Sequence, residues 1–324
     1  MKKYNTFCIR PLIALTFCLM VFYQVPANAQ TLNNEFRKGV LPNQMFDTRS
    51  LSMANTTIAD LYGWTSIGVN PALTGLFANP LFLQFNSNYN WNTNLMQHNL
   101  SLPTMTVGSQ HFTTRFGIIH PEFENMPYKD NSSLPPPDIT LYRAEVAYAI
   151  ALSSYFSIGT LQSLSYTTSN EEAHYWNYFA DVGLIYAPDG TISYALVLRG
   201  LGNETTYEII ETGLTTLGTR MARQILEIGA TFRYPVEETT YLSISFANEK
   251  RFGEEGLWYK GGVELIPDSA VKIRGGIMVN FDQSEYVPRF GFGFNTGGFM
   301  LDYMIAPNNL TGEQFHQVGL TIQL

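Results

Sequence analysis

The residue types that usually carry catalysis are few in this chain, and they are not spaced for it. Its five histidines show no metal-ligand spacing; they are His98, His111, His120, His174 and His316. No Gly-x-Ser-x-Gly nucleophile motif occurs. His174 and Asp181 are the one acid–base pair worth considering, and no further residue supports it. We therefore expect a protein that is not an enzyme and that needs no cofactor and no metal ion.

Glycines and paired acids also lack a chemical pattern. Gly291, Gly293 and Gly297 miss the spacing of a dinucleotide-binding loop, and they lie in a predicted strand and turn, so we interpret them as packing residues. Paired glutamates fall in predicted connections, where water solvates them: Glu171-Glu172, Glu237-Glu238 and Glu254-Glu255.

One stretch, residues 49–77, differs from the rest because its pattern is helical. In its first half apolar residues recur at helical spacing, at Met53, Ala54, Ile58, Leu61 and Tyr62. Gly63 and Gly68 interrupt this helix, and Asn70 and Pro71 are suited to the N-cap and first position of a second helix through residue 77. Almost everything after it resembles strand, so we expect this segment to lie as a plug inside a wide barrel.

The first 29 residues have the features of a signal peptide. Lys2, Lys3 and Arg10 precede an apolar core at 12–25, and Ala27-Asn28-Ala29 is a cleavage signal. Both cysteines, Cys8 and Cys18, lie in this segment, so the mature chain has no disulfide and no thiolate site. We divide the chain into a signal peptide (1–29), an N-terminal extension with the plug (30–79) and a barrel (80–324).

The charge balance argues against nucleic acid as a partner. Without the signal peptide the chain has 16 basic and 27 acidic residues, a net charge of −11. Charged residues make up 14% of the sequence, below the roughly 25% of an ordinary soluble domain, and aromatic residues also make up 14%. This composition favours a wall with an apolar band and aromatic girdles in lipid.

From residue 80 onward about fourteen segments have strand character, and in most of them apolar and polar residues alternate. They lie near 80–90, 94–102, 110–119, 140–152, 155–168, 175–187, 191–201, 223–234, 239–249, 257–266, 271–280, 286–296, 298–306 and 315–324. Short and long connections alternate from the second strand onward, which is typical of outer-membrane barrels. Lipid offers no hydrogen bonds, so the sheet must close, and about fourteen strands enclose a lumen too wide for side chains alone to fill. A soluble β-sandwich or propeller remains the alternative.

Charged residues inside the strands fall on the face opposite the apolar one. A charge facing lipid costs about 2–4 kcal/mol at mid-depth, so these side chains must point into the lumen, where they can pair or hold the plug. They are Arg143, Glu145, Glu227, Arg233, Lys260, Glu264, Lys272, Arg274 and Asp302.

The long connection at 202–222 contains apolar residues at near-helical spacing: Ile209, Ile210, Leu214 and Leu217. Two interpretations are open. The segment is either a surface helix that binds a ligand or partner, or a loop folded over the barrel mouth.

The plug stretch resembles the N-terminal region of the FadL-like family of outer-membrane transporters. The similar features are Met53, Ala59-Asp60 and Asn70-Pro71-Ala72, in that order. The glycines usual around Met53 are replaced by Ser52, Ala54 and Asn55, and the last residue is Leu324, not an aromatic. The resemblance implies a fourteen-stranded outer-membrane barrel with an N-terminal plug.

Within this family the chain looks most like the Bacteroidota branch that contains PorV and PorQ, on the segments TISYALVLRGLGN and LDYMIAPNNLTGEQFHQVGLTIQL. The branch implies a component of the type IX protein secretion system, with secretion components or cargo proteins as partners. The alternative is a FadL-like channel that takes up small hydrophobic molecules, with Asn70-Pro71 as its gate. The PorP/SprF family shares the Asn-Pro-Ala motif, so that assignment also stays open.

Overall fold

The structure is a computed structural model that describes residues 47–61, 66–76, 83–90, 95–121, 139–169, 174–210, 213–267, 270–307 and 314–323. Its strands are β1 (Gln84–Asn90), β2 (Leu95–Ser101), β3 (Met105–Val107), β4 (Gln110–Pro121), β5 (Ile139–Ser153), β6 (Phe156–Ser169), β7 (His174–Tyr186), β8 (Ile192–Ile210), β9 (Gly213–Met221), β10 (Ile225–Pro235), β11 (Tyr241–Arg251), β12 (Trp258–Ile266), β13 (Val271–Asn280), β14 (Glu285–Thr296), β15 (Phe299–Pro307) and β16 (Gln314–Gln323). The predicted signal peptide and residues 30–46 lie outside the described residues.

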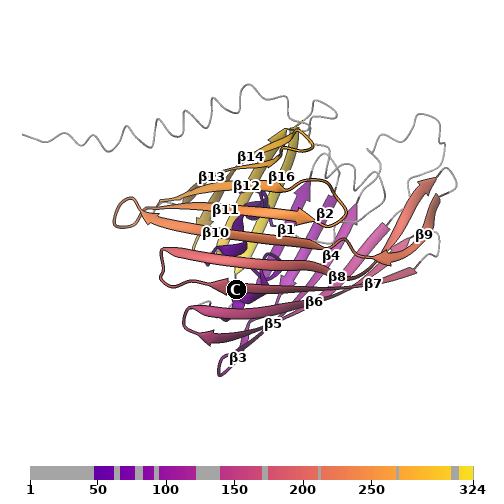
Figure 1. The fold of residues 1–324 in the computed structure, drawn as a ribbon, viewed down its shortest axis with the longest axis horizontal. Coiled ribbons are helices and arrows are strands. Elements are labelled where there is room, and N and C mark those ends of the chain that lie inside the picture. Colours follow the sequence, from indigo (N-terminus) through magenta and orange to yellow (C-terminus); the bar gives the residue numbers. More distant parts are fainter. Residues whose placement is uncertain are drawn as a thin grey trace, which may run out of the picture.

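Fourteen antiparallel strands close into a barrel (Figure 1). The first and last barrel strands pair with each other, from Gln84 with Gln323 to Asn90 with Gln317. On the far side β8 pairs directly with β10. The remaining two strands are additions, because β3 pairs only with β4 and β9 pairs only with β8. The predicted barrel and its number of strands are confirmed.

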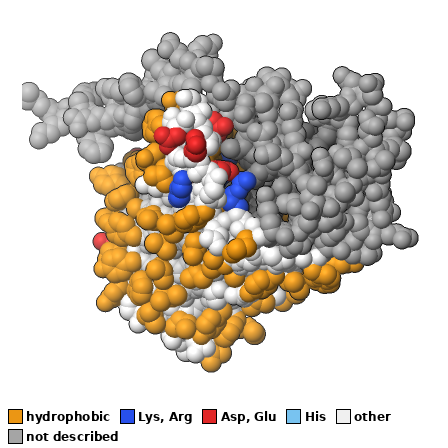
Figure 2. Space-filling view, turned by 45° about the vertical axis from the view of Figure 1, so that its right-hand side comes forward, with side chains coloured by type: hydrophobic (Ala, Val, Ile, Leu, Met, Phe, Trp, Pro, Cys, Tyr) orange, Lys and Arg blue, Asp and Glu red, His pale blue; other side chains and the backbone are white. Residues whose placement is uncertain are grey.

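The wall strands have an apolar outer face, and their inner face mixes small and polar residues with buried apolar ones such as Trp258 and Met304. In β14 Phe292 and Phe294 are exposed, whereas Gly291 and Gly293 between them are buried. Because successive side chains of a strand point to opposite faces, the phenyl rings face outward and the glycines face the lumen. Figure 2 shows the outer surface as mostly hydrophobic, with acidic and basic side chains gathered at one end.

The connections differ in length at the two ends of the barrel. Tight turns join β5 to β6 and β14 to β15, each leaving only two residues between the strands. In the turn after β7, Asp189 accepts hydrogen bonds from the backbone N–H groups of Ile192 (2.9 Å) and Thr191 (2.8 Å), which hold the pKa of its carboxyl below its usual range. At the opposite end β8 and β9 form a long hairpin that extends past its neighbours (Figure 1).

The N-terminal segment forms four short helices: α3 (Thr48–Ser52) and the 3₁₀ turns η1 (Thr57–Ala59), η2 (Ser66–Gly68) and η3 (Pro71–Gly75). None of the helices in the described part of the chain is long and apolar enough to cross a membrane.

The predicted first helix of the plug is wrong in its extent. The α-helix ends at Ser52, and Ala54 and Asn55 then take left-handed backbone conformations with φ of 58°. Ser52 and Thr56 donate side-chain hydrogen bonds to backbone carbonyls three residues earlier, which competes with a regular helix. The predicted second helix is the single 3₁₀ turn η3, and its start is confirmed, because Asn70 is the N-cap and Pro71 follows it.

Candidate functional site: a plug anchored inside the barrel

The plug crosses the lumen and contacts the wall on several sides. Helix α3 packs against β13, β14, β15 and β16, turn η1 packs against β8, β10 and β11, and η3 packs against β4, β5, β6 and β7. All residues from 47 to 60 and from 67 to 75 are buried. Burial on all sides explains why the helical spacing of apolar residues did not mark one buried face.

Glycines on the inner face of the wall make room for the plug backbone. A Cβ atom on Gly159 would lie 2.5 Å from the carbonyl carbon of Pro71, and one on Gly276 would lie 2.6 Å from the amide nitrogen of Ala54. Gly262 likewise faces the backbone carbonyl of Met53, whereas Gly183, Gly229, Gly291 and Gly319 face plug side chains. A side chain at Gly159, Gly262 or Gly276 would displace the plug backbone, so the wall and the plug are fitted to each other.

Asn70 joins two parts of the plug and connects them to the wall. Its side-chain oxygen accepts a hydrogen bond from the Ala72 amide (3.0 Å), and its nitrogen donates to the carbonyls of Ile58 (2.9 Å) and Leu184 (3.2 Å). The pyrrolidine ring of Pro71 lies against Gly183 in β7. The predicted gate residues Asn70, Pro71 and Ala72 are therefore at the plug–wall contact, and Ala72 is fully buried.

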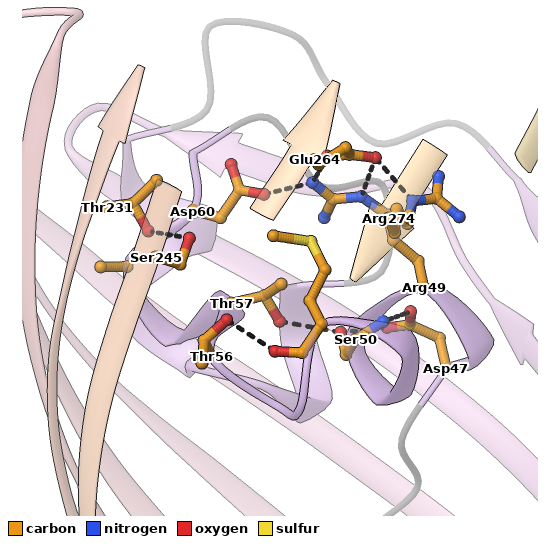
Figure 3. Close-up of polar contacts among 12 residues, drawn as sticks. Asp47, Arg49, Ser50, Thr56, Thr57, Asp60, Thr231, Ser245, Glu264 and Arg274 are labelled. Atoms are coloured by element: carbon orange, nitrogen blue, oxygen red, sulfur yellow. Dashed lines mark hydrogen bonds and ion pairs between the residues drawn. The ribbon is translucent and has the colours of Figure 1, made fainter. Parts of the chain in front are cut away.

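Arg49 is the main charged contact between α3 and the wall. Its guanidinium binds Glu264 of β12, with Nη2 2.5 Å from Oε2 and Nε 3.2 Å from Oε1, and it also forms an ion pair with Asp60 of the plug. Figure 3 shows Arg49 reaching from α3 toward Asp60 on one side and Glu264 on the other. All three side chains are at most 5% exposed, so these charges interact without screening by water.

The ion pairs continue along the wall. Arg274 Nε donates to Glu264 Oε1 at 2.7 Å, and its Nη1 pairs with Asp302. These predicted lumen residues lie on the inner faces of adjacent or near-adjacent strands, β12, β13 and β15. The structure thus brings Asp60, Glu264, Arg274 and Asp302 together around one plug residue, Arg49.

A second cluster holds the chain between η2 and η3. Arg199 of β8 donates to the carbonyls of Gly68 (3.1 Å) and Val69, and its Nε lies 2.9 Å from Glu227 Oε2. Glu227 in turn pairs with Lys260 Nζ at 2.6 Å. The predicted residues Glu227 and Lys260 therefore act on the plug through Arg199.

The other predicted lumen charges make further contacts. Arg143 and Glu145 are buried on β5, and Glu145 accepts a hydrogen bond from Arg115 Nε at 2.5 Å. The guanidinium of Arg233 lies 4.1 Å from the centre of the Tyr241 ring, and Lys272 is half-buried.

Apolar contacts complete the fit of the plug. Ile58 and Ala59 pack with Val69 and with Val197 of the wall, and the Ala59 carbonyl accepts a hydrogen bond from Ser193 Oγ at 2.5 Å. Met53 is fully buried beside Gly262. Within the described residues no group of histidine, cysteine or acidic side chains could hold a metal ion. What these contacts provide is a tight fit between the plug and the wall.

The segment at 202–222 is neither a helix nor an irregular loop. Ile209 and Ile210 end β8, and Leu214 and Leu217 lie in β9. Threonines dominate between them, and β-branched residues favour strand over helix. The predicted surface helix is wrong here, and the segment is a two-stranded extension of the wall.

Sequence reasoning missed several residues that hold the plug in its conformation and against the wall. Arg49 and Arg199 were not singled out, nor was Asp47, which caps α3 by accepting a hydrogen bond from the Ser50 amide at 2.7 Å. The rule that a buried charge needs a partner would have marked Arg49, since it is the first residue of a stretch predicted to be buried. Glycines at inward positions of successive strands were the second available signal.

Comparisons with known proteins support the fold alone. No protein-family model and no curated protein matches the sequence. Among solved structures, the toluene transporter TodX of Pseudomonas putida is 10% identical, with a TM-score of 0.53 over 87% of this chain and 98% of that chain. The toluene transporter TbuX of Ralstonia pickettii is 12% identical (TM-score 0.53; 86% and 97%), and the monoaromatic hydrocarbon channel CymD is 10% identical (TM-score 0.54; 86% and 97%).

Proposed function

We propose that this chain is a FadL-like channel of the outer membrane, without enzymatic activity, that takes up small hydrophobic molecules such as monoaromatic hydrocarbons. The observation that carries the proposal is a plug anchored inside a closed barrel whose fold is shared with hydrocarbon channels. Its signal peptide (1–29) directs export, residues 30–79 supply the extension and plug, and residues 80–324 form the wall.

Passage requires one part of the plug to move, and the contacts indicate which part. Helix α3 is held by buried ion pairs through Arg49, and breaking such a pair costs about 3–5 kcal/mol. Gly68 and Val69 are held by the charged Arg199, whereas turn η3 after them is held to the wall by a neutral hydrogen bond from Asn70 to Leu184, worth about 0.5–1.5 kcal/mol, and by apolar contacts. In this mechanism η3 moves with its Asn70-Pro71-Ala72 gate, while α3 stays anchored.

Toluene flux into proteoliposomes tests the proposal. Replacing Asn70-Pro71-Ala72 by Gly-Ser-Gly removes the cap and the contacts at Gly183, so toluene flux should increase. The control is Gly261→Ser, at a wall position where an added Cβ has its nearest neighbour at 3.8 Å. Wild-type protein that gives no toluene flux above empty vesicles would contradict the proposal. Equal flux in the gate variant and wild type would show that Asn70-Pro71-Ala72 is not the gate.

A component or accessory of the type IX secretion system is the second candidate, and the β8–β9 hairpin favours it. This hairpin, whose two strands contain Ile209, Ile210, Leu214 and Leu217, extends past the ends of neighbouring strands, where a secretion component or cargo protein could bind (Figure 1). Deleting residues 204–220 should then abolish export of type IX cargo while toluene flux is retained. Normal export by that deletion strain would rule out this function for the hairpin.

A further inference from the structure

Gln162 of β6 is an exposed polar side chain on the outer face of the wall. Its chain neighbours Leu161 and Ser163 are buried on the inner face, so Gln162 points away from the lumen. It lies six residues after Phe156 and seven before Ser169, the two ends of β6. The side chain is therefore in the middle of a wall strand, on the face that meets lipid, between β5 and β7 (Figure 1).

Aromatic contacts on both sides of Gln162 mark the borders of the lipid-facing band. At the end with the tight turns the rings of Tyr155 and Tyr186 are 5.8 Å apart, and at the opposite end those of Tyr166 and Trp176 are 4.6 Å apart. At about 3.3 Å per residue, Gln162 is about 13 Å along the strand from Tyr166 and about 20 Å from the start of β6. Its amide is therefore surrounded by hydrocarbon.

The amide of Gln162 uses only half of its hydrogen-bonding capacity. Its Nε2 donates to Thr160 Oγ1 at 3.0 Å, and its Oε1 accepts from the hydroxyl of Tyr178. A primary amide has two N–H donors and two acceptor lone pairs. The described part of the chain gives it no other partner, so one N–H and one lone pair remain. Lipid tails supply neither donor nor acceptor, and leaving both groups unbonded there costs free energy.

Other polar side chains on the outer face differ from Gln162 in exposure or in depth. Ser87 of β1 and His98 of β2 are half-buried. Asn248 is exposed, but it lies three residues before the end of β11 and pairs with Tyr259 near the rim, where water is close. The outward residues in the middle of β13 have no polar side-chain atom: Ile273, Gly275, Ile277 and Val279. An exposed amide deep in the band is therefore a particular feature of the β5–β7 face.

We propose that the outer face of β5–β7 around Gln162 binds a second copy of this chain in the plane of the membrane. A twofold axis along the membrane normal would place Gln162 against the partner's Gln162. The free N–H of each amide then meets the free oxygen of the other, so a second copy supplies both groups that lipid lacks. The residues paired with Gln162 across the sheet are Val146 and Ala180, and their small side chains let two walls approach closely. This interface goes beyond the proposed function, which needs a single barrel.

Energy transfer between donor- and acceptor-labelled copies in lipid vesicles tests the interface. The full chain carries one dye on Glu238→Cys, in the exposed turn after β10, with Cys8 and Cys18 replaced by serine. The variant Gln162→Leu removes the amide from the middle of the band, and the control Asn248→Leu removes an exposed amide near the end of a strand. We expect dimers in the labelled background and the control, and an association constant at least tenfold lower for Gln162→Leu.

Three results would overturn the inference. They are energy transfer in the background no higher than random mixing gives, equal association constants for Gln162→Leu and the background, and an equal loss in Asn248→Leu. A folding defect is distinguished by urea titration with at most one molecule per vesicle. There Gln162→Leu should unfold at the same urea concentration as the background or a higher one, because lipid solvates leucine better than an amide. A lower concentration would show that the amide supports its own wall, and would also contradict the proposal.

Discussion

Replacing Arg49 by methionine should release the plug from the wall. The guanidinium is shared by Glu264 and Asp60, and all three groups are almost fully buried. Removing one partner of a buried ion pair costs about 3–5 kcal/mol. Because the ion pair exists only when the plug is closed, its loss raises the free energy of the closed state relative to the open one. The fraction of molecules with an open plug then rises by about 100-fold to several thousand-fold.

The charge balance of the cluster predicts that Glu264→Gln is milder. Arg49, Arg274, Asp60, Glu264 and Asp302 carry a formal net charge of −1. Methionine at 49 changes this to −2, whereas glutamine at 264 brings it to zero and keeps an acceptor for the arginines. We expect a cost of about 1–2 kcal/mol, which is roughly a 5- to 30-fold increase in opening.

A single cysteine at Ser52 reports the opening. Ser52 is fully buried in the plug, and Cys8 and Cys18 are the only native cysteines, so both are replaced by serine in the background. When the plug opens and closes faster than the reagent reacts, maleimide labelling follows the open fraction. Labelling of Arg49→Met within twofold of the background, or slower than labelling of Glu264→Gln, would refute the reasoning.

Three further outcomes follow from the fold. Gly276→Val should expose the Ser52 reporter, since an added Cβ would lie 2.6 Å from the plug backbone, whereas Gly261→Val on the outer face should not; equal labelling of the two would contradict the fit. Phe292→Arg should lower the free energy of unfolding of the refolded barrel in lipid by about 2–4 kcal/mol, measured by urea titration. Thr296→Arg, at the end of the same strand, should lower it by only about 0–1 kcal/mol. A larger loss for Thr296→Arg than for Phe292→Arg would show that Phe292 does not lie in the middle of the membrane. Unboiled protein should migrate differently from boiled protein on a detergent gel, and identical mobility would count against a closed barrel.

Strands could be predicted from the sequence because their two faces meet different media. Alternation such as Phe290, Phe292 and Phe294 with Gly291 and Gly293 separates an apolar face from a face of small residues, and the exposed rings of Phe292 and Phe294 identify the apolar face as the outer one. The end of β8 was missed because its residues from Glu204 onward extend beyond the barrel and pair with β9 alone. Beyond the barrel the two faces of β8 do not meet different surroundings, so alternation of apolar and polar residues cannot reveal the strand.

The plug could be predicted as a segment but not in its shape. Its capping residues Asn70 and Pro71 act locally, so η3 begins where the sequence indicates. The turn at Ala54 and Asn55 is flanked by local hydrogen bonds from the Ser52 and Thr56 side chains, but its backbone fits against Gly262 and Gly276, more than two hundred residues away. No local pattern could show that distant contact. Arg49 and Glu264 are separated by 215 residues, and their pairing likewise depends on the closed barrel.

Tying the gate to the wall tests the central claim most directly. A Cβ on Gly75 would lie 3.4 Å from the Cβ of Ala149, close to the distance in a disulfide, and Ser157→Gly removes the one side chain in the way. In the variant Gly75→Cys/Ala149→Cys/Ser157→Gly, with Cys8 and Cys18 replaced by serine, toluene flux into proteoliposomes should be low when oxidised and restored by a reductant. Equal flux in the oxidised and reduced states would show that molecules cross without movement of η3, and would contradict the account.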